Sequence, residues 1–257
     1  DAMGQKGENE LPIRIVAFRS EKDYAPYSPR AASPAFYLSG ADRDYIVLAQ
    51  VGAENYETAV HEYVHYLIKH AQVKIPVWFN EGLADFYSTL KPAGDRVRVG
   101  DLPEGRLLTV RQGKWIPMED LLAAGHGSRE YNSKDHVGMF YSQSWALTHM
   151  LRMDGRFSAD GAKLVAALDG GADSIDAVRS VYGLSPAELE KALRLYVQGE
   201  RFYASLFDVK LAKAAEAPAV GPAPPMDVDL SLAQILASYA DRRGRAEEML
   251  RKLSAEH

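Results

Sequence analysis

Two histidines in the first third of the chain are spaced as ligands of a single metal ion. The run from His61 to His65 reads H-E-x-x-H, with Glu62 between them. On a helix, residues four apart share one face, so both imidazoles can reach the same ion while Glu62 acts as general base toward a water. A pair of ordinary surface histidines is the alternative. Both residues lie beside an apolar stripe, however, where an imidazole without a partner is disfavoured.

A second run supplies the remaining ligand. It reads W-F-N-E-G-L-A-D, and its Glu81 follows His65 by 16 residues, which leaves room for a turn and a returning helix. Because the chain contains no Cys, a metal site must use His, Asp and Glu. Two His with one Glu is a ligand set of catalytic zinc. The sequence therefore predicts one Zn²⁺ per chain, held by His61, His65 and Glu81.

Two neighbours of Glu81 are expected to support this site. Asp85 follows Glu81 by one helical turn and points the same way, so we expect it to accept the second ring N–H of a ligand histidine. The alternative is that Glu81 and Asp85 form an acidic helix face exposed to solvent. Gly82 in mid-helix costs about 1 kcal/mol relative to Ala, and we expect it to allow close approach to the histidine helix.

The elements that must position these residues follow from apolar periodicity. Residues 56–70 have the spacing of a helix that ends before Pro76, and a second helix starts at that proline and continues to the Lys91-Pro92-Ala93-Gly94 segment. Before them, a small sheet is predicted from strands at 13–18, 35–38 and 45–49. After them, we predict strands at 96–99 and 107–111, and helices at 118–123, 138–153, 175–182 and from a capping box at 185–188 onward.

These features resemble a known group of enzymes. H-E-x-x-H followed by N-E-G-x-A is similar to the gluzincin zinc metallopeptidases, especially the peptidase-MA-like family and, more distantly, aminopeptidase N and thermolysin. The two motifs span about 35 residues, and the order of strands and helices extends the resemblance to roughly the first 205. The resemblance implies an α+β, zincin-like domain with a small N-terminal sheet, an active-site helix and a mostly helical C-terminal half.

The family also implies a donor to the oxyanion of the tetrahedral intermediate. Tyr141 follows Glu81 by 60 residues, in a segment F-Y-S-Q-S-W-A-L that resembles the helix carrying the catalytic tyrosine of the aminopeptidases. A tyrosine packed on a helix face with Trp145 is the alternative. His126 and His136 are rival donors, since another gluzincin branch uses a histidine here, although a loop histidine is more often an ordinary surface residue.

The resemblance implies hydrolysis of peptide bonds by a zinc-activated water. The chain lacks the G-x-M-E-N segment whose Glu grips a substrate's free N-terminus in the aminopeptidases, which favours endopeptidase cleavage. An extended peptide would pair with a sheet edge, for which we choose residues 35–38. The alternatives are a catalytically inactive zincin-fold scaffold that binds partner proteins, and a zinc hydrolase of a non-peptide amide or ester. Glu62 disfavours the scaffold, because a structural site needs no base.

Composition and charge bound the remaining possibilities. The 257 residues are 47% hydrophobic and 25% charged, which suits one or two globular domains. A net charge of −5 without a dense basic run disfavours nucleic acid as a partner. No apolar stretch reaches the ~20 residues that cross a bilayer. Export of similar proteins and the absence of Cys favour a periplasmic or extracellular location, with the cytoplasm as the alternative, and this expectation allows for a signal segment before residue 1.

The C-terminal part differs in composition from the rest. We expect a peptidase domain at 1–210, an Ala/Pro-rich linker at 211–226 and a tetratricopeptide-like helical hairpin at 227–257, with its turn at Gly244. One such repeat cannot bury its own apolar face. Either further repeats belong to it or it packs on the main domain, and a partner protein would bind through this segment.

Overall fold

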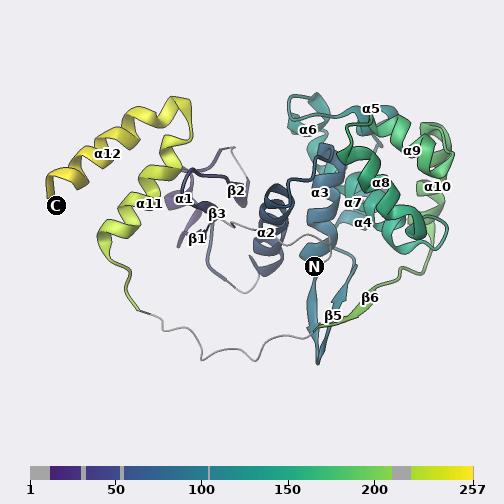
Figure 1. The fold of residues 1–257 in the computed structure, drawn as a ribbon, viewed down its shortest axis with the longest axis horizontal. Helices are drawn as coiled ribbons and strands as arrows, with labels where there is room; N and C mark the ends of the chain where they lie inside the picture. Colours follow the sequence, from purple (N-terminus) through teal and green to yellow (C-terminus); the bar gives the residue numbers. More distant parts are fainter. Residues whose placement is uncertain (1–11, 30–32, 53–54, 104, 210–220, 257) are drawn as a thin grey trace. The chain divides into compact units, whose positions relative to one another are not determined.

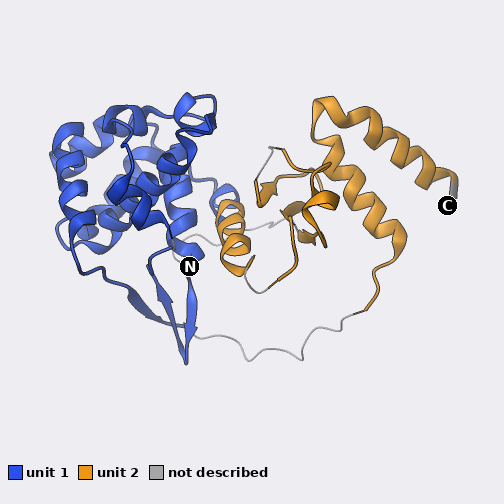
Figure 2. Cartoon of the chain, turned by 180° about the vertical axis from the view of Figure 1, so that it is seen from behind, with its two compact units in different colours: residues 1–5, 67–209 blue, residues 6–66, 210–257 orange. Residues whose placement is uncertain are grey.

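A computed structural model describes residues 12–29, 33–52, 55–103, 105–209 and 221–256. Within these residues the chain forms two compact units (Figure 2). Unit 1 covers Leu67–Val209, and unit 2 combines the described residues up to Tyr66 with those from 221 onward. The boundary lies inside one helix, α2 (Tyr56–His70). Both units contain helices and strands, so the chain is of mixed α+β type; most of the expected linker lies outside the described residues.

Unit 2 is built on a three-stranded sheet of order β1-β3-β2 (Figure 1). The strands are β1 (Ile13–Ala17), β2 (Ala35–Leu38) and β3 (Asp44–Leu48), and a short helix α1 (Glu21–Tyr24) follows β1. β3 runs parallel to β1 and antiparallel to β2. All of β3 is buried, as a central strand covered on both faces requires. In the described chain β2 pairs with β3 alone, so the predicted strands are confirmed and β2 is an edge strand, while its pairing with a peptide stays a prediction.

The two faces of this sheet are covered by helices from opposite ends of the sequence. Because side chains alternate along a strand, Ile46 and Leu48 point to one face, where Ala59 of α2 packs against them. Tyr45 and Val47 point to the other face. There they join a cluster with residues of the C-terminal helices α11 (Pro225–Ala237) and α12 (Arg243–Glu256), namely Ile235, Leu236 and Ala246.

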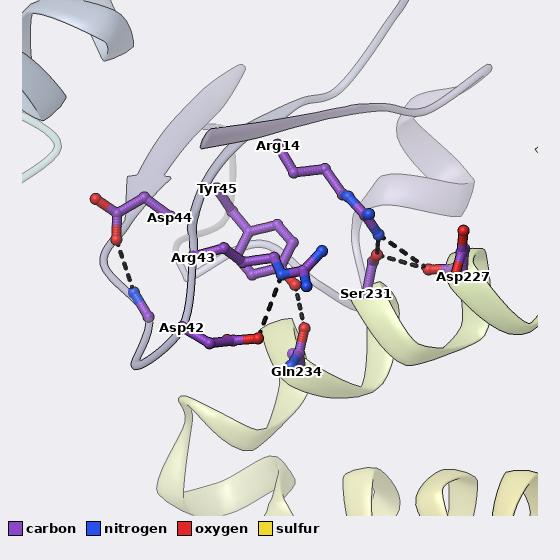
Figure 3. Close-up of polar contacts among 9 residues, drawn as sticks. Arg14, Asp42, Arg43, Asp44, Tyr45, Asp227, Ser231 and Gln234 are labelled. Carbon is purple, nitrogen blue, oxygen red and sulfur yellow. Dashed lines mark hydrogen bonds and ion pairs between the residues drawn. The ribbon is translucent and has the colours of Figure 1, made fainter. Parts of the chain in front are cut away.

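Polar contacts fix the C-terminal hairpin on the sheet (Figure 3). Arg14 of β1 donates from Nη1 to Ser231 Oγ at 2.7 Å, and the hydroxyl of Tyr45 donates to the side-chain oxygen of Gln234. The hairpin therefore buries its apolar face against a sheet of its own chain. The prediction that the hairpin turns at Gly244 is wrong. The chain leaves α11 at Ser238 and passes through η3 (Ala240–Arg242), and Gly244 lies in the first turn of α12.

Unit 1 is mainly helical, with α7 (Val137–Met153) buried along most of its length. Its three-stranded antiparallel sheet has the order β4-β5-β6 and consists of β4 (Lys91–Ala93), β5 (Arg96–Val99) and β6 (Ser205–Asp208). The other elements are α3 (Val77–Ser88), α4 (Arg106–Gln112), α5 (Met118–Ala123), α6 (Arg129–Asn132), η2 (Ser158–Asp160), α8 (Gly161–Asp169), α9 (Ser174–Tyr182) and α10 (Pro186–Gln198).

Most predicted elements of unit 1 are confirmed, including the capping box, in which Ser185 and Glu188 each accept a hydrogen bond from the other's backbone N–H. The predicted strand at 107–111 is wrong, because this run is helix α4. Its β-branched and leucine residues suggested a strand, but only Val110 is buried, which suits one helical face. The predicted second helix ends at Ser88, and the Lys91 segment expected to stop it is strand β4.

Gly82 allows close packing of α3, but on a different helix from the one expected. A Cβ built on Gly82 would lie 2.1 Å from Thr148 Oγ1 and 2.4 Å from the carbonyl oxygen of Ser144. These are the nearest atoms, and both belong to α7. The prediction that the glycine faces the histidine helix is therefore wrong. A residue without a Cβ is needed where α3 meets α7.

Replacing Gly82 with Ala is expected to destabilise the protein by about 1–3 kcal/mol, the usual cost of overpacking. The rigid carbonyl of Ser144 cannot withdraw as a flexible side chain could, so the clash outweighs the helix-propensity gain of about 1 kcal/mol. Urea unfolding measures the change. The matched control is Gly138→Ala in α7, where a Cβ meets nothing within 4 Å and stability should rise slightly. Equal behaviour of the two variants would contradict the packing argument.

Candidate metal centre

The two histidines occupy the same face of α2, which confirms the predicted helix from Tyr56 to His70. Their Nε2 atoms lie 3.1 Å apart, and their ring planes are 84° to one another. For comparison, two imidazoles bound to one tetrahedral zinc at 2.0–2.1 Å have nitrogens about 3.3 Å apart. The Nε2 atoms of His61 and His65 are thus close enough together to bind one ion.

Glu81 of α3 completes a group that could hold a metal ion. The ligand atoms of His61, His65 and Glu81 all lie within 4.8 Å of one another. Glu81 is buried, and its Oε1 accepts a hydrogen bond of 2.8 Å from the hydroxyl of Tyr131 in α6. A carboxylate away from water is costly unless it is hydrogen-bonded and paired with positive charge. A cation bound by the two imidazoles would provide that charge.

In the sequence, Glu62 lies between His61 and His65. It is also buried, with 8% of its surface exposed. Its carboxylate is close enough to Tyr24 of α1 to interact electrostatically: burial raises the pKa of Tyr24, and the negative charge of Glu62 raises it further. Glu62 therefore does not extend into bulk water as an ordinary surface glutamate would. The role of Glu62 as general base toward a metal-bound water stays a prediction.

Asp85, one turn after Glu81, is held by an arginine. Arg106 of α4 forms an ion pair with Asp85, with Nε 2.7 Å from Oδ2, and its Nη2 donates a hydrogen bond to Oδ1 at 3.4 Å. Asp85 is buried and the Arg106 side chain is 29% exposed, so this pair is shielded from solvent more than a surface salt bridge. Asp85 thus has a cationic partner in unit 1, and its predicted contact with a ligand histidine stays a prediction.

Tyr141 lies near these residues in unit 1. It sits in the second turn of α7, half-buried, with the Arg106 guanidinium carbon 5.1 Å from its ring centroid and the Tyr131 ring at 6.2 Å. Of the rival donors, His126 is exposed and contacts the Tyr131 ring edge-on, and His136 is the residue before α7. Tyr141 therefore contacts Tyr131, which donates to Glu81, and Arg106, which pairs with Asp85.

Two residues of this arrangement were missed from the sequence, and both come from outside the two motifs. Tyr131 lies in a helix of four residues, which is too short to produce a periodicity. Arg106 immediately precedes the segment for which a strand was predicted, and it is the first residue of helix α4. In the sequence, the residue type alone indicated either contact. The hydroxyl of Tyr131 and the guanidinium of Arg106 can both donate to carboxylates.

His149 is buried as well but is already hydrogen-bonded at both ring nitrogens. Its Nε2 lies 2.9 Å from the carbonyl oxygen of Gly100, which can only accept, so Nε2 carries the proton. Nδ1 then accepts from the hydroxyl of Tyr196 at 2.6 Å. Burial lowers the pKa of His149, which favours this neutral form. The residue has a structural role in unit 1, away from the metal group.

A cavity of about 510 Å³ opens elsewhere in unit 1. The segment before α3, the end of α5 and the start of α9 line it, and its lining includes none of the candidate site residues. None of the helices in the described part of the chain has the length and apolar content that a bilayer crossing requires.

Comparison with family models, with curated proteins and with solved structures finds no match to this chain.

Proposed function

We propose that this chain is a zinc-dependent peptidase of zincin-like fold, with His61, His65 and Glu81 as ligands and Glu62 as general base. One observation carries the proposal. Two imidazoles and a carboxylate form a potential metal group, and the residue that follows the first histidine in the sequence is a buried glutamate that does not belong to that group. A structural site needs ligands only, so the additional carboxylate supports catalysis. The order of sheet, histidine helix and glutamate helix along the chain supports the zincin-like fold.

The donor set fits zinc better than the other common divalent ions. Imidazole with a single carboxylate suits Zn²⁺, whereas Mg²⁺ and Ca²⁺ prefer sites made of oxygen ligands. Three protein ligands leave a position for water or substrate, as in catalytic rather than structural zinc sites. When bound, zinc would supply a Lewis acid that polarises the scissile carbonyl and makes water more acidic.

The side chains of the protein would carry the proton transfers. Glu62 would take a proton from the attacking water and pass it to the leaving amine. Tyr141 would donate its O–H to the developing oxyanion. An extended peptide would pair with the side of β2 opposite β3, which pairs with no other strand among the described residues. Peptide-bond cleavage within a chain needs no group that binds a free N-terminus.

The proposal is tested by zinc content and by zinc-dependent hydrolysis. Protein purified without chelator and dialysed against trace zinc is expected to contain about one zinc per chain, by elemental analysis. It should cleave members of a fluorogenic peptide library, lose this activity with chelator and regain it on addition of zinc. A folded protein without zinc would overturn the proposal and favour the scaffold. One zinc with hydrolysis of esters or amides alone would favour the non-peptide hydrolase.

A further inference from the structure

The hydrogen bond from Tyr131 to Glu81 has no role in the chemistry proposed above. The donor oxygen lies 2.8 Å from Oε1 of the glutamate, and both residues are buried in unit 1. A neutral hydroxyl provides no charge to stabilise a buried carboxylate, as an arginine or lysine would. It does fix the direction of the carboxylate group, because the O–H bond must point at one particular oxygen.

Tyr131 is itself held firmly enough to impose that direction. Its ring contacts the ring of Phe140 at 5.4 Å, in an edge-on arrangement, and that of His126 at 5.7 Å. Asn132 is the last residue of the short helix that carries Tyr131. Its Nδ2 donates to the carbonyl oxygens of His126 at 2.6 Å and Ser128 at 2.8 Å. The tyrosine hydroxyl is therefore positioned by packing on one side and by backbone hydrogen bonds on the other.

We propose that Tyr131 is a positioning residue for the metal centre, acting through Glu81. This inference rests on the proposed function. By donating to Oε1, Tyr131 would limit rotation of the carboxylate group and so hold it in one orientation toward the metal. A carboxylate held in this way needs no reorientation when the ion arrives. A carboxylate without the tyrosine would rotate, and it would lose affinity for the metal. Hydrogen-bond partners of metal ligands typically contribute a factor of about 10–100 to metal affinity.

The test is the zinc affinity of Tyr131→Phe, measured by competition with a chromophoric zinc chelator. We expect zinc to bind roughly 10–100-fold more weakly than to the unaltered protein, since the phenylalanine keeps the ring contacts and removes only the hydrogen bond. The matched control is Tyr196→Phe, which removes a partly buried hydroxyl that donates to His149 in the same unit. Loss of that hydroxyl should lower stability without changing zinc affinity.

Two further variants separate positioning from a structural role. In a Glu81→Ala background, Tyr131→Phe should change zinc affinity less than about twofold, because the two residues act through one contact. Tyr131→His keeps an aromatic ring with a donor, and it should bind zinc more tightly than Tyr131→Phe. It also serves as the test if the phenylalanine variant does not fold.

The outcomes also separate this inference from the proposed function. If the unaltered protein binds zinc tightly and Tyr131→Phe binds it equally well, the positioning role is overturned and the peptidase proposal stands. If the unaltered protein binds no zinc, both fail. If Tyr131→Phe weakens zinc binding equally with and without Glu81, the tyrosine acts by another route and the inference is wrong.

Discussion

Glu62→Gln is expected to lose peptide hydrolysis by roughly 10²–10⁴-fold, the usual contribution of a general base, while zinc content stays unchanged. Glutamine has nearly the same shape as glutamate, but its amide cannot take a proton from water. His61 and His65, the proposed ligands on either side, remain in place on the same helix. The measurements are kcat/KM on a peptide that the unaltered protein cleaves, and zinc per chain by elemental analysis.

Glu57→Gln is the matched control for this substitution. Glu57 lies in the first turn of the same helix, before the proposed ligands, and belongs to no proposed part of the chemistry. Its substitution should leave both rate and zinc content close to those of the unaltered protein. Full activity in Glu62→Gln would exclude Glu62 as the general base. Loss of zinc together with activity would show instead that the carboxylate supports the metal site.

The sequence predicted what depends on local patterns. The bounds of α2 follow from the apolar spacing between Tyr56 and His70, and Pro76 separates it from α3. The histidines share a face because a four-residue spacing on a helix allows nothing else. The sheet before α2 was predictable for the same reason, since its short strands carry β-branched and aromatic residues between turn residues. These elements hold the residues that were predicted to bind metal.

The sequence did not predict which elements contact one another across long distances. Nothing local to Gly82 indicates that its nearest neighbours lie in α7, more than 60 residues later. Tyr131 and Arg106 likewise reach Glu81 and Asp85 only through the fold of unit 1. Helix and strand propensities describe the chain near a residue, whereas these contacts depend on how helices pack.

The C-terminal hairpin illustrates the same limit. Its leucine and alanine periodicity predicted two helices, and both are present as α11 and α12. The partner of their apolar face is the N-terminal sheet, through Tyr45 and Val47, almost two hundred residues earlier in the chain. Composition alone could not distinguish this from a stack of further repeats, since both bury the same face. The hairpin thus covers one face of the sheet whose other face carries α2, the helix of His61 and His65.

Tyr141→Phe is expected to lower kcat by about 10²–10³-fold, as loss of an oxyanion donor typically does, with little change in KM or zinc content. The Arg106 guanidinium lies over the Tyr141 ring, and Arg106 is itself paired with Asp85, so the ring should keep its orientation without the hydroxyl. Phenylalanine then removes the donor alone, and the loss should appear in the chemical step. His126→Asn and His136→Asn test the rival donors and should each cost less than about threefold in kcat. A large loss in either histidine variant, with Tyr141→Phe fully active, would transfer the role of oxyanion donor to that histidine.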